Sequence, residues 1–124
     1  MFCGVDITEV DRIKIAVERT GQPFLNRIYT EAEQAYCESR RSHRYESYAG
    51  RFAAKEAVSK AMGTGFRDKV AFSMIEILND DLGKPYCILH GSTAEYFEEH
   101  FTGMTISVSI SHTKDSAVAF AVIG

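Results

Sequence analysis

Residues 43–65 read HRYESYAGRFAAKEAVSKAMGTG and form the longest helical pattern in the chain. The pattern predicts a helix from about His43 to Met62 that ends at the glycines of Gly63-Thr64-Gly65. At about 100° per residue, Glu56 falls in the middle of an otherwise apolar helix face. A carboxylate there is costly to desolvate unless a cation meets it. Glu56 is therefore either paired with Lys60, one turn further on, or part of a functional site. The other members of this face are Tyr45, Ala49 and Phe52.

A second acid lies in a predicted strand over residues 2–10. The side chains alternate there, with Cys3, Val5 and Ile7 on one side and Gly4, Asp6 and Thr8 on the other. Aspartate is unfavourable inside a strand, so Asp6 either caps a turn, pairs with an arginine, or meets Glu56 if the strand packs on the long helix. Two carboxylates without histidine or thiol would make a hard oxygen site suited to Mg²⁺.

The remaining pattern predicts short elements on both sides of the long helix. Helices are predicted over about Asp11–Arg19, from the capping-box pair Thr30 and Glu33 toward Cys37, and from a second pair, Ser92 and Glu95, toward His100. Strands are predicted over Phe72–Leu78 and Pro85–Leu89. A hairpin follows, with Ile106, Val108 and Ile110 in its first arm and Ala117–Ile123 in its second. Because strands and helices do not alternate regularly, we expect an α+β fold. It would be a single compact domain over residues 1–124, with a long central helix packed on a small, mainly antiparallel sheet.

Composition excludes several classes of protein. The 124 residues are 45% hydrophobic and 25% charged, which is typical of one globular domain. The longest apolar run, Ala117–Ile123, is seven residues long, whereas a membrane helix needs roughly 20. The first residues lack a basic leader and include Asp6, so we expect a cytoplasmic protein that does not span a membrane. Cys3, Cys37 and Cys87 form no C-x-x-C pair, so neither a disulfide framework nor a zinc site is predicted.

Charge is unevenly distributed along the chain, although the net charge is only −3. Residues 40–60 contain six basic and two acidic side chains, and residues 76–100 contain six acidic side chains and one lysine. A local basic stretch in an acidic protein indicates an anionic ligand held at one place, and argues against a nucleic acid bound along a whole face.

Candidate phosphate-binding residues surround Glu56. Arg51, Lys55 and Lys60 precede the glycines Gly63 and Gly65, and glycine allows phosphate oxygens to approach the backbone closely. The glycines would equally serve to end the helix. Weaker candidates are Lys84 and Pro85 of the turn Gly83-Lys84-Pro85, and His112 beside two hydroxyl side chains and Lys114; each would equally be an ordinary surface residue.

Taken together, these segments closely resemble the holo-acyl-carrier-protein synthases, the short bacterial type of 4'-phosphopantetheinyl transferase. The resemblance covers nearly the whole chain in order, and the stretch 50–65 is the most specific part of it. The matching segments are Gly4-Val5-Asp6-Ile7-Thr8-Glu9-Val10, Gly50-Arg51-Phe52-Ala53-Ala54-Lys55-Glu56-Ala57, Ser59-Lys60-Ala61-Met62-Gly63-Thr64-Gly65, Gly83-Lys84-Pro85 and Ser109-Ile110-Ser111-His112.

The resemblance implies a specific reaction. Such enzymes move the 4'-phosphopantetheine arm of coenzyme A onto a serine of apo-acyl carrier protein and release adenosine 3',5'-bisphosphate, a step that serves fatty acid biosynthesis. By analogy, Asp6 and Glu56 would bind Mg²⁺, and Lys60 with Gly63 and Gly65 would lie along the coenzyme. The phosphates would lie near Arg51 and His112.

Catalysis and assembly follow from the same resemblance. Lys60 would neutralise charge on the pyrophosphate, and Glu56 is the candidate base, with His112 as its rival. Family members are trimers whose coenzyme cleft lies between adjacent subunits and whose first helix receives the carrier, so Arg12 and Arg27 are candidate carrier-binding residues. Two other readings stay open, namely a module that binds coenzyme A without chemistry and a structural oligomerisation domain.

Overall fold

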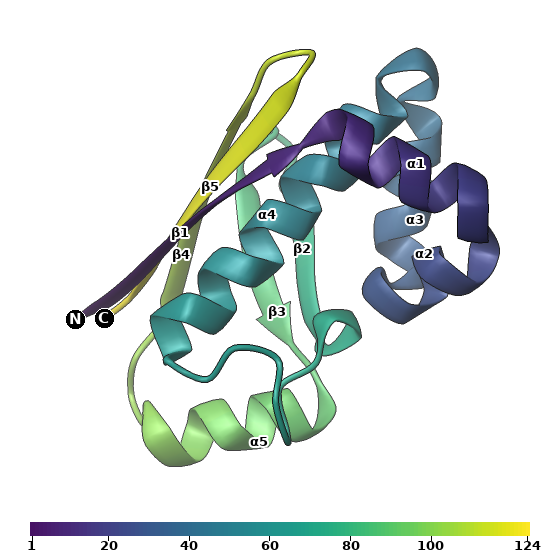
Figure 1. Ribbon diagram of the computed structural model, residues 1–124. Helices are drawn as coiled ribbons and strands as arrows, with labels where there is room; N and C mark the ends of the chain where they lie inside the picture. The colour runs from purple at the N-terminus through teal and green to yellow at the C-terminus, as the bar shows by residue number, and fades with distance from the viewer.

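The computed structural model describes residues 1–124 and contains five strands and five α-helices, with the longest helix at the centre (Figure 1). In chain order the elements are β1 (Phe2–Glu9), α1 (Val10–Thr20), α2 (Gln22–Ile28), α3 (Glu31–Ser39), the 3₁₀ turn η1 (Arg41–His43), α4 (Arg44–Met62), the 3₁₀ turn η2 (Phe72–Met74), β2 (Ile75–Asn79), β3 (Pro85–Leu89), α5 (Gly91–His100), β4 (Ile106–His112) and β5 (Ser116–Ile123).

Two antiparallel sheets lie around α4. The larger sheet has the strand order β1-β5-β4, and β2 and β3 form a separate hairpin. In Figure 1, α4 crosses the face of the larger sheet, α1 to α3 cover one end of α4, and α5 lies below its other end. This arrangement confirms the α+β class expected from the sequence.

The approach of β1 to α4 depends on Gly4. A Cβ atom at Gly4 would overlap the carbonyl oxygen of Ala57 and would lie only 2.7 Å from the backbone nitrogen of Ala61. Any side chain at this position would therefore push the strand off the helix. Because β1 runs so close to α4, Asp6, two residues further along the same strand face, is brought to the helix surface.

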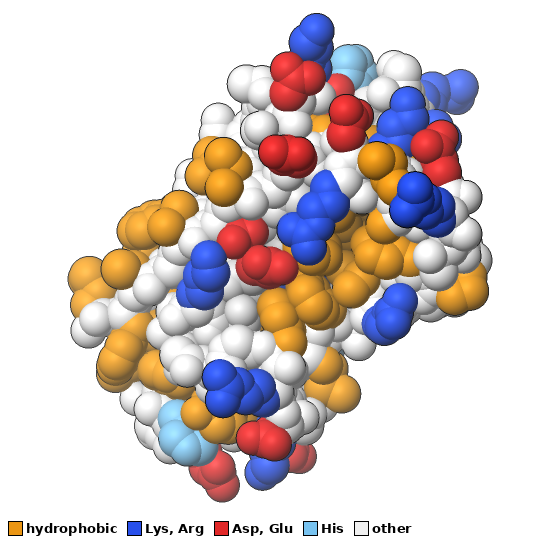
Figure 2. All heavy atoms as spheres, viewed as in Figure 1, with side chains coloured by type: hydrophobic (Ala, Val, Ile, Leu, Met, Phe, Trp, Pro, Cys, Tyr) orange, Lys and Arg blue, Asp and Glu red, His pale blue; other side chains and the backbone are white.

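Where β1 and β5 pack most closely on α4, small residues lie inside and larger ones point outward. The alanines of β5 at 117, 119 and 121 are buried against α4, whereas Val118 and Phe120 on the other face are 39% and 45% exposed. The same holds for β1, where Gly4 and Thr8 are buried while Val5 and Ile7 are 55% and 68% exposed. Figure 2 shows hydrophobic side chains gathered along the side of the molecule formed by β1 and β5. The apolar face of β1 is thus not covered by its own chain.

Most predicted elements are confirmed, with local differences. The capping box of Thr30 and Glu33 opens α3, and the left-handed Gly63 ends α4. The strand predicted from residue 72 begins at Ile75, after a 3₁₀ turn. Ser92 does not cap α5, because His90 holds that position and the Ser92 hydroxyl donates to the carbonyl of Lys69. Helix α2 was not predicted. No helix in the structure is both long enough and apolar enough to cross a membrane.

Candidate functional site

The two carboxylates singled out in the sequence are neighbours where β1 crosses α4. Burial raises the pKa of Glu56, and the adjacent Asp6 carboxylate raises it further. The Glu56–Lys60 ion pair considered as an alternative is wrong, because the Lys60 Nζ lies 3.0 Å from Oδ1 of Asp6 and also donates to the Val5 carbonyl. Figure 2 shows acidic side chains flanked by basic ones at this place. The two carboxylates are therefore neighbours, and the ammonium group of Lys60 lies beside Asp6.

This acid pair fits a divalent cation with hard oxygen ligands. No third histidine, cysteine, aspartate or glutamate joins Asp6 and Glu56 in a cluster. A pair of carboxylates is the usual protein share of a Mg²⁺ site, where waters and substrate phosphates supply the other ligands. The two carboxylates lie close together, and a divalent cation bound between them would offset their repulsion.

A cleft of about 200 Å³ lies on a different side of α4 and contains three other predicted residues. Arg51, Pro85 and His112 all line it, together with Gly50. Glycine at residue 50 brings α4 close to β4, since a Cβ there would lie 3.1 Å from the Cγ2 atom of Ile110. None of Asp6, Glu56 and Lys60 lines this cleft. One chain therefore presents the predicted residues as two separate groups.

Arg51 forms the floor of the cleft and is only 4% exposed. Its guanidinium lies over the ring of Tyr36, 4.3 Å from the centroid, and one terminal nitrogen donates to Oδ1 of Asn79. The Nε atom is buried and has no hydrogen-bond partner. A buried donor without an acceptor is costly, so an anion bound in the cleft would stabilise the guanidinium of Arg51.

His112 stands at the end of β4 on the rim of the same cleft. Its Nδ1 atom lies 3.4 Å from Oε2 of Glu46, and the other oxygen of Glu46 lies 3.3 Å from Nδ1 of His43. The contact to Glu46 engages Nδ1 and leaves Nε2 of His112 without a protein partner. With the side chain 47% exposed, Nε2 is free to contact a ligand.

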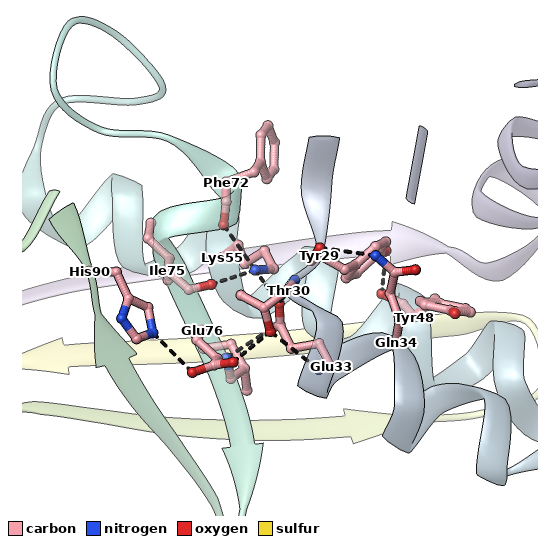
Figure 3. A network of polar contacts seen from close by, with 11 residues as sticks. Tyr29, Thr30, Glu33, Gln34, Tyr48, Lys55, Phe72, Ile75, Glu76 and His90 are labelled. Carbon is pink, nitrogen blue, oxygen red and sulfur yellow. Dashed lines mark hydrogen bonds and ion pairs between the residues drawn. The ribbon is translucent and has the colours of Figure 1, made fainter. Parts of the chain in front are cut away.

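Lys55 has a different role from the one expected. Its ammonium has no exposed surface and lies 2.8 Å from Oε1 of Glu33. It also donates to the backbone carbonyls of Phe72, at 2.9 Å, and Ile75. Figure 3 shows this group enclosed between α3, α4 and β2. We therefore correct the expectation that Lys55 binds the coenzyme, because all three of its protons have partners inside the protein.

The buried network continues from Glu33 toward the surface. Thr30 donates from its hydroxyl to Glu76, and His90 lies 2.9 Å from the other Glu76 oxygen (Figure 3). Burial by itself would raise the pKa of Glu76, but the hydrogen bonds from Thr30 and His90 together hold it below its ordinary value. These groups tie the β2–β3 hairpin to α3 and lie away from both candidate sites.

The remaining predicted residues are accessible. Gly63 and Gly65 both have positive φ, and nothing lies within 4 Å of where a Cβ would stand. Lys84 is exposed in the turn next to Pro85. Arg12 and Arg27 are exposed on α1 and α2, and the charge of Arg12 is close enough to lower the pKa of Glu56 in part.

Sequence reasoning missed five residues of the cleft: Tyr36, Arg40, Glu46, Ser47 and Asn79. Asn79 is the last residue of β2, and its neighbours in the sequence do not mark it as part of a site. Glu46 and Gly50 are four residues apart and so share a helix face, and an isolated glycine inside a helix indicates a close approach. That signal was available for Glu46. None was available for Tyr36, which reaches the cleft from α3.

Enzymes that act on phosphate esters commonly have a pair of acids beside a lysine, and a cleft whose arginine is not neutralised by a carboxylate. The chain matches the family model of the 4'-phosphopantetheinyl transferase superfamily over residues 2–121. It is 55% identical to the holo-[acyl-carrier-protein] synthase of Ruminiclostridium cellulolyticum over 123 residues, which are 99% of this chain and 91% of that protein. This chain therefore belongs to the 4'-phosphopantetheinyl transferase superfamily.

Solved structures agree with this assignment. The crystal structure of holo-[acyl-carrier-protein] synthase from Neisseria meningitidis is similar with a TM-score of 0.88 and 36% identity, covering 99% of this chain and 97% of that one. The Helicobacter pylori synthase in complex with coenzyme A is similar with a TM-score of 0.84 and 32% identity, covering 98% and 99%. The family and fold expected from the sequence are confirmed.

Proposed function

We propose that this protein transfers the 4'-phosphopantetheine group of coenzyme A to a serine hydroxyl of an apo-acyl carrier protein and releases adenosine 3',5'-bisphosphate. The observation that carries the proposal is the pair of adjacent carboxylates, Asp6 and Glu56, with Lys60 3.0 Å from Asp6. Family membership supports it, as does the neighbour from Helicobacter pylori, whose structure holds coenzyme A.

In this reaction the serine oxygen bonds to the phosphorus next to pantetheine, and the bond from that phosphorus to the bridging pyrophosphate oxygen breaks. Adenosine 3',5'-bisphosphate leaves with the bonding electrons. Asp6 and Glu56 would hold Mg²⁺, which when bound neutralises charge on the pyrophosphate. Lys60 adds a positive charge at the same place, and Arg51 and His112 bind phosphate oxygens.

The serine proton needs an acceptor, and we propose Glu56 for this role with His112 as the alternative. Glu56 belongs to the acid pair at which the pyrophosphate would be held, so its carboxylate would lie near the attacking serine oxygen. The Nε2 atom of His112 has no protein partner, but His112 lies at the rim of the Arg51 cleft, apart from the acid pair.

The test of the function is direct. Incubation of the protein with coenzyme A, Mg²⁺ and an apo carrier should add the mass of one phosphopantetheine to the carrier serine, measured by mass spectrometry of the intact carrier. Chelation of divalent cations should stop the reaction. Binding of coenzyme A without any mass added to the carrier would instead favour a coenzyme-binding module.

We propose that the protein acts as a homotrimer with the coenzyme between adjacent subunits. Two observations support this assembly. The outer face of the larger sheet exposes large apolar side chains, a pattern typical of a surface that another subunit covers. The acid pair and the Arg51 cleft also lie apart on one chain, so a neighbouring subunit would let the two groups of residues face each other.

Replacing Phe120 with glutamate should therefore dissociate the protein. The side chain is 45% exposed on the outer face of β5, so the isolated subunit should tolerate the change, while a buried charge at the interface should not be tolerated. Light scattering coupled to size exclusion should show monomers, and transfer should fall at least about 100-fold, which corresponds to roughly 2.7 kcal/mol.

A matched control is Ile88→Glu, which places the same charge on an apolar residue of the β2–β3 hairpin that is 37% exposed. This variant should keep the assembly of the wild type. A monomeric Phe120→Glu variant with full activity would contradict a site shared between subunits.

We propose that the carrier docks on the face that carries Arg12 and Arg27. Positive charge on this face would attract an acidic carrier, and Arg12 lies near enough to Glu56 to lower its pKa. A carrier held by Arg12 would thus present its serine next to the acid pair.

We also propose a cytoplasmic location, because the three cysteines are free, as is usual in a reducing compartment.

A further inference from the structure

Arg51 differs from the other charged side chains in the protein interior. Four charged residues are buried, and three of them have an oppositely charged or titratable partner: Lys55 and Glu33 pair with each other, and Glu76 pairs with His90. Arg51, only 4% exposed, has no carboxylate within 4 Å. An isolated buried charge is unfavourable, so the surroundings of Arg51 call for an explanation.

The groups that touch Arg51 are all neutral. Asn79 accepts a hydrogen bond from the guanidinium through Oδ1, and Tyr36 offers the face of its ring. Cys37 is near enough to feel the charge, yet burial raises the pKa of its thiol to about 12, so it remains protonated. The one acid lining the cleft, Glu46, is engaged by His43 and His112. Only one of the five guanidinium N–H donors has an acceptor in the protein.

Asn79 also connects Arg51 to the turn between β2 and β3. Its amide nitrogen donates to the carbonyl oxygen of Gly83 at 2.9 Å, while its amide oxygen accepts from Arg51. Asp80 holds the same turn by accepting from the backbone nitrogens of Leu82 and Lys84, each at 2.9 Å. Asn79 thus fixes the position of Arg51 relative to Gly83 and Pro85, both of which line the cleft.

We infer that Asn79 is a positioning residue that keeps the coenzyme cleft positively charged. Its neutral amide holds Arg51 in place without cancelling the charge of the guanidinium. That charge remains available to bind the phosphates of coenzyme A. This inference rests on the proposed function. An aspartate would have nearly the same shape, but its carboxylate would form a charge-assisted pair with Arg51 and compete with the ligand.

The test compares Asn79→Asp with Asn79→Ala. Both lose the hydrogen bond to Gly83, but only aspartate neutralises Arg51. We expect Asn79→Asp to raise the Kd for coenzyme A at least about tenfold, by calorimetry with Mg²⁺ present. Asn79→Ala should raise it only about threefold, because Arg51 loses one contact but is still held by the ring of Tyr36 and keeps its charge. In thermal unfolding without ligand, Asn79→Asp should be the more stable of the two, because its carboxylate meets the buried guanidinium.

Asn26→Asp is the matched control, since Asn26 is exposed, lies outside the cleft and likewise accepts side-chain hydrogen bonds, from Gln22 and Gln34. Its Kd should equal that of the wild type. Equal weakening by aspartate and alanine at residue 79 would overturn the inference and show that Asn79 matters only for the turn. If the wild type itself fails to bind coenzyme A, the proposed function fails instead.

Discussion

Replacing Glu56 with glutamine is expected to lower kcat for phosphopantetheine transfer by about 10³-fold, which corresponds to roughly 4 kcal/mol of lost transition-state stabilisation. The substitution keeps the shape of the side chain but removes one of the two charges that would hold the cation. Because Asp6 and burial both disfavour the ionised form of Glu56, glutamine should not destabilise the fold. The rate is measured with coenzyme A and apo carrier at saturating concentrations.

Thermal unfolding separates this effect from misfolding. Without Mg²⁺, Glu56→Gln should unfold at the same temperature as the wild type or higher, since the repulsion with Asp6 is gone. With Mg²⁺, the wild type should gain stability by binding the ion and the variant should not. Glu99→Gln, at a glutamate whose side chain is 68% exposed, serves as the control. A Glu56→Gln variant that transfers at the wild-type rate would remove the acid pair from the mechanism.

The elements predicted correctly are those with strong local signals. The 19 residues of α4 carry a long helical pattern and end at a glycine with φ of 79°, and a capping box marks the start of α3. Helix α2 has only seven residues, with proline near its start, and it is held by packing of Leu25 and Ile28 against other helices. Such a short segment has too few periodic positions to be recognised from sequence.

The orientation of β1 shows a different limit. Alternation reveals that a strand has two distinct faces, but it does not tell which face the chain itself covers. Here α4 covers the face with Gly4 and Thr8, because only small side chains allow the close approach, and Val5 and Ile7 point outward. These larger apolar residues form a surface that the chain itself does not cover. Considering one chain alone therefore could not predict that they point outward.

The site was predictable where its residues bear unusual chemistry for their element. An aspartate in a strand and a glutamate on an apolar helix face were both conspicuous, and the structure brings them together. Proximity in sequence misled for Lys55, which adjoins Glu56 but lies about 100° around the helix from it. Asn79 contacts Arg51 across 28 residues of chain, and no local pattern signals a contact over that distance.

Lys55→Met is expected to lower the free energy of unfolding by about 3–5 kcal/mol, the usual cost of leaving one member of a buried ion pair alone. Both Lys55 and Glu33 have fully buried side chains. The carboxylate of Glu33 also accepts from the backbone nitrogens of Thr30 and Ile77, so it cannot turn toward solvent without breaking α3 and β2 contacts. Total stability for a domain of this size is about 5–15 kcal/mol, and urea unfolding measures the loss.

The double variant Lys55→Met with Glu33→Gln identifies the cause. It removes both charges, so it should recover part of the lost stability, and the two substitutions should be strongly non-additive. Recovery should be incomplete, because glutamine has one acceptor oxygen for the two backbone N–H groups that the Glu33 carboxylate binds. It also supplies a folded protein in which KM for coenzyme A can be measured if the single variant does not fold. We expect that KM to stay within about twofold of the wild type, because Lys55 lies between α3, α4 and β2 with no exposed surface (Figure 3). A normal stability with a KM raised tenfold would instead return Lys55 to the coenzyme site.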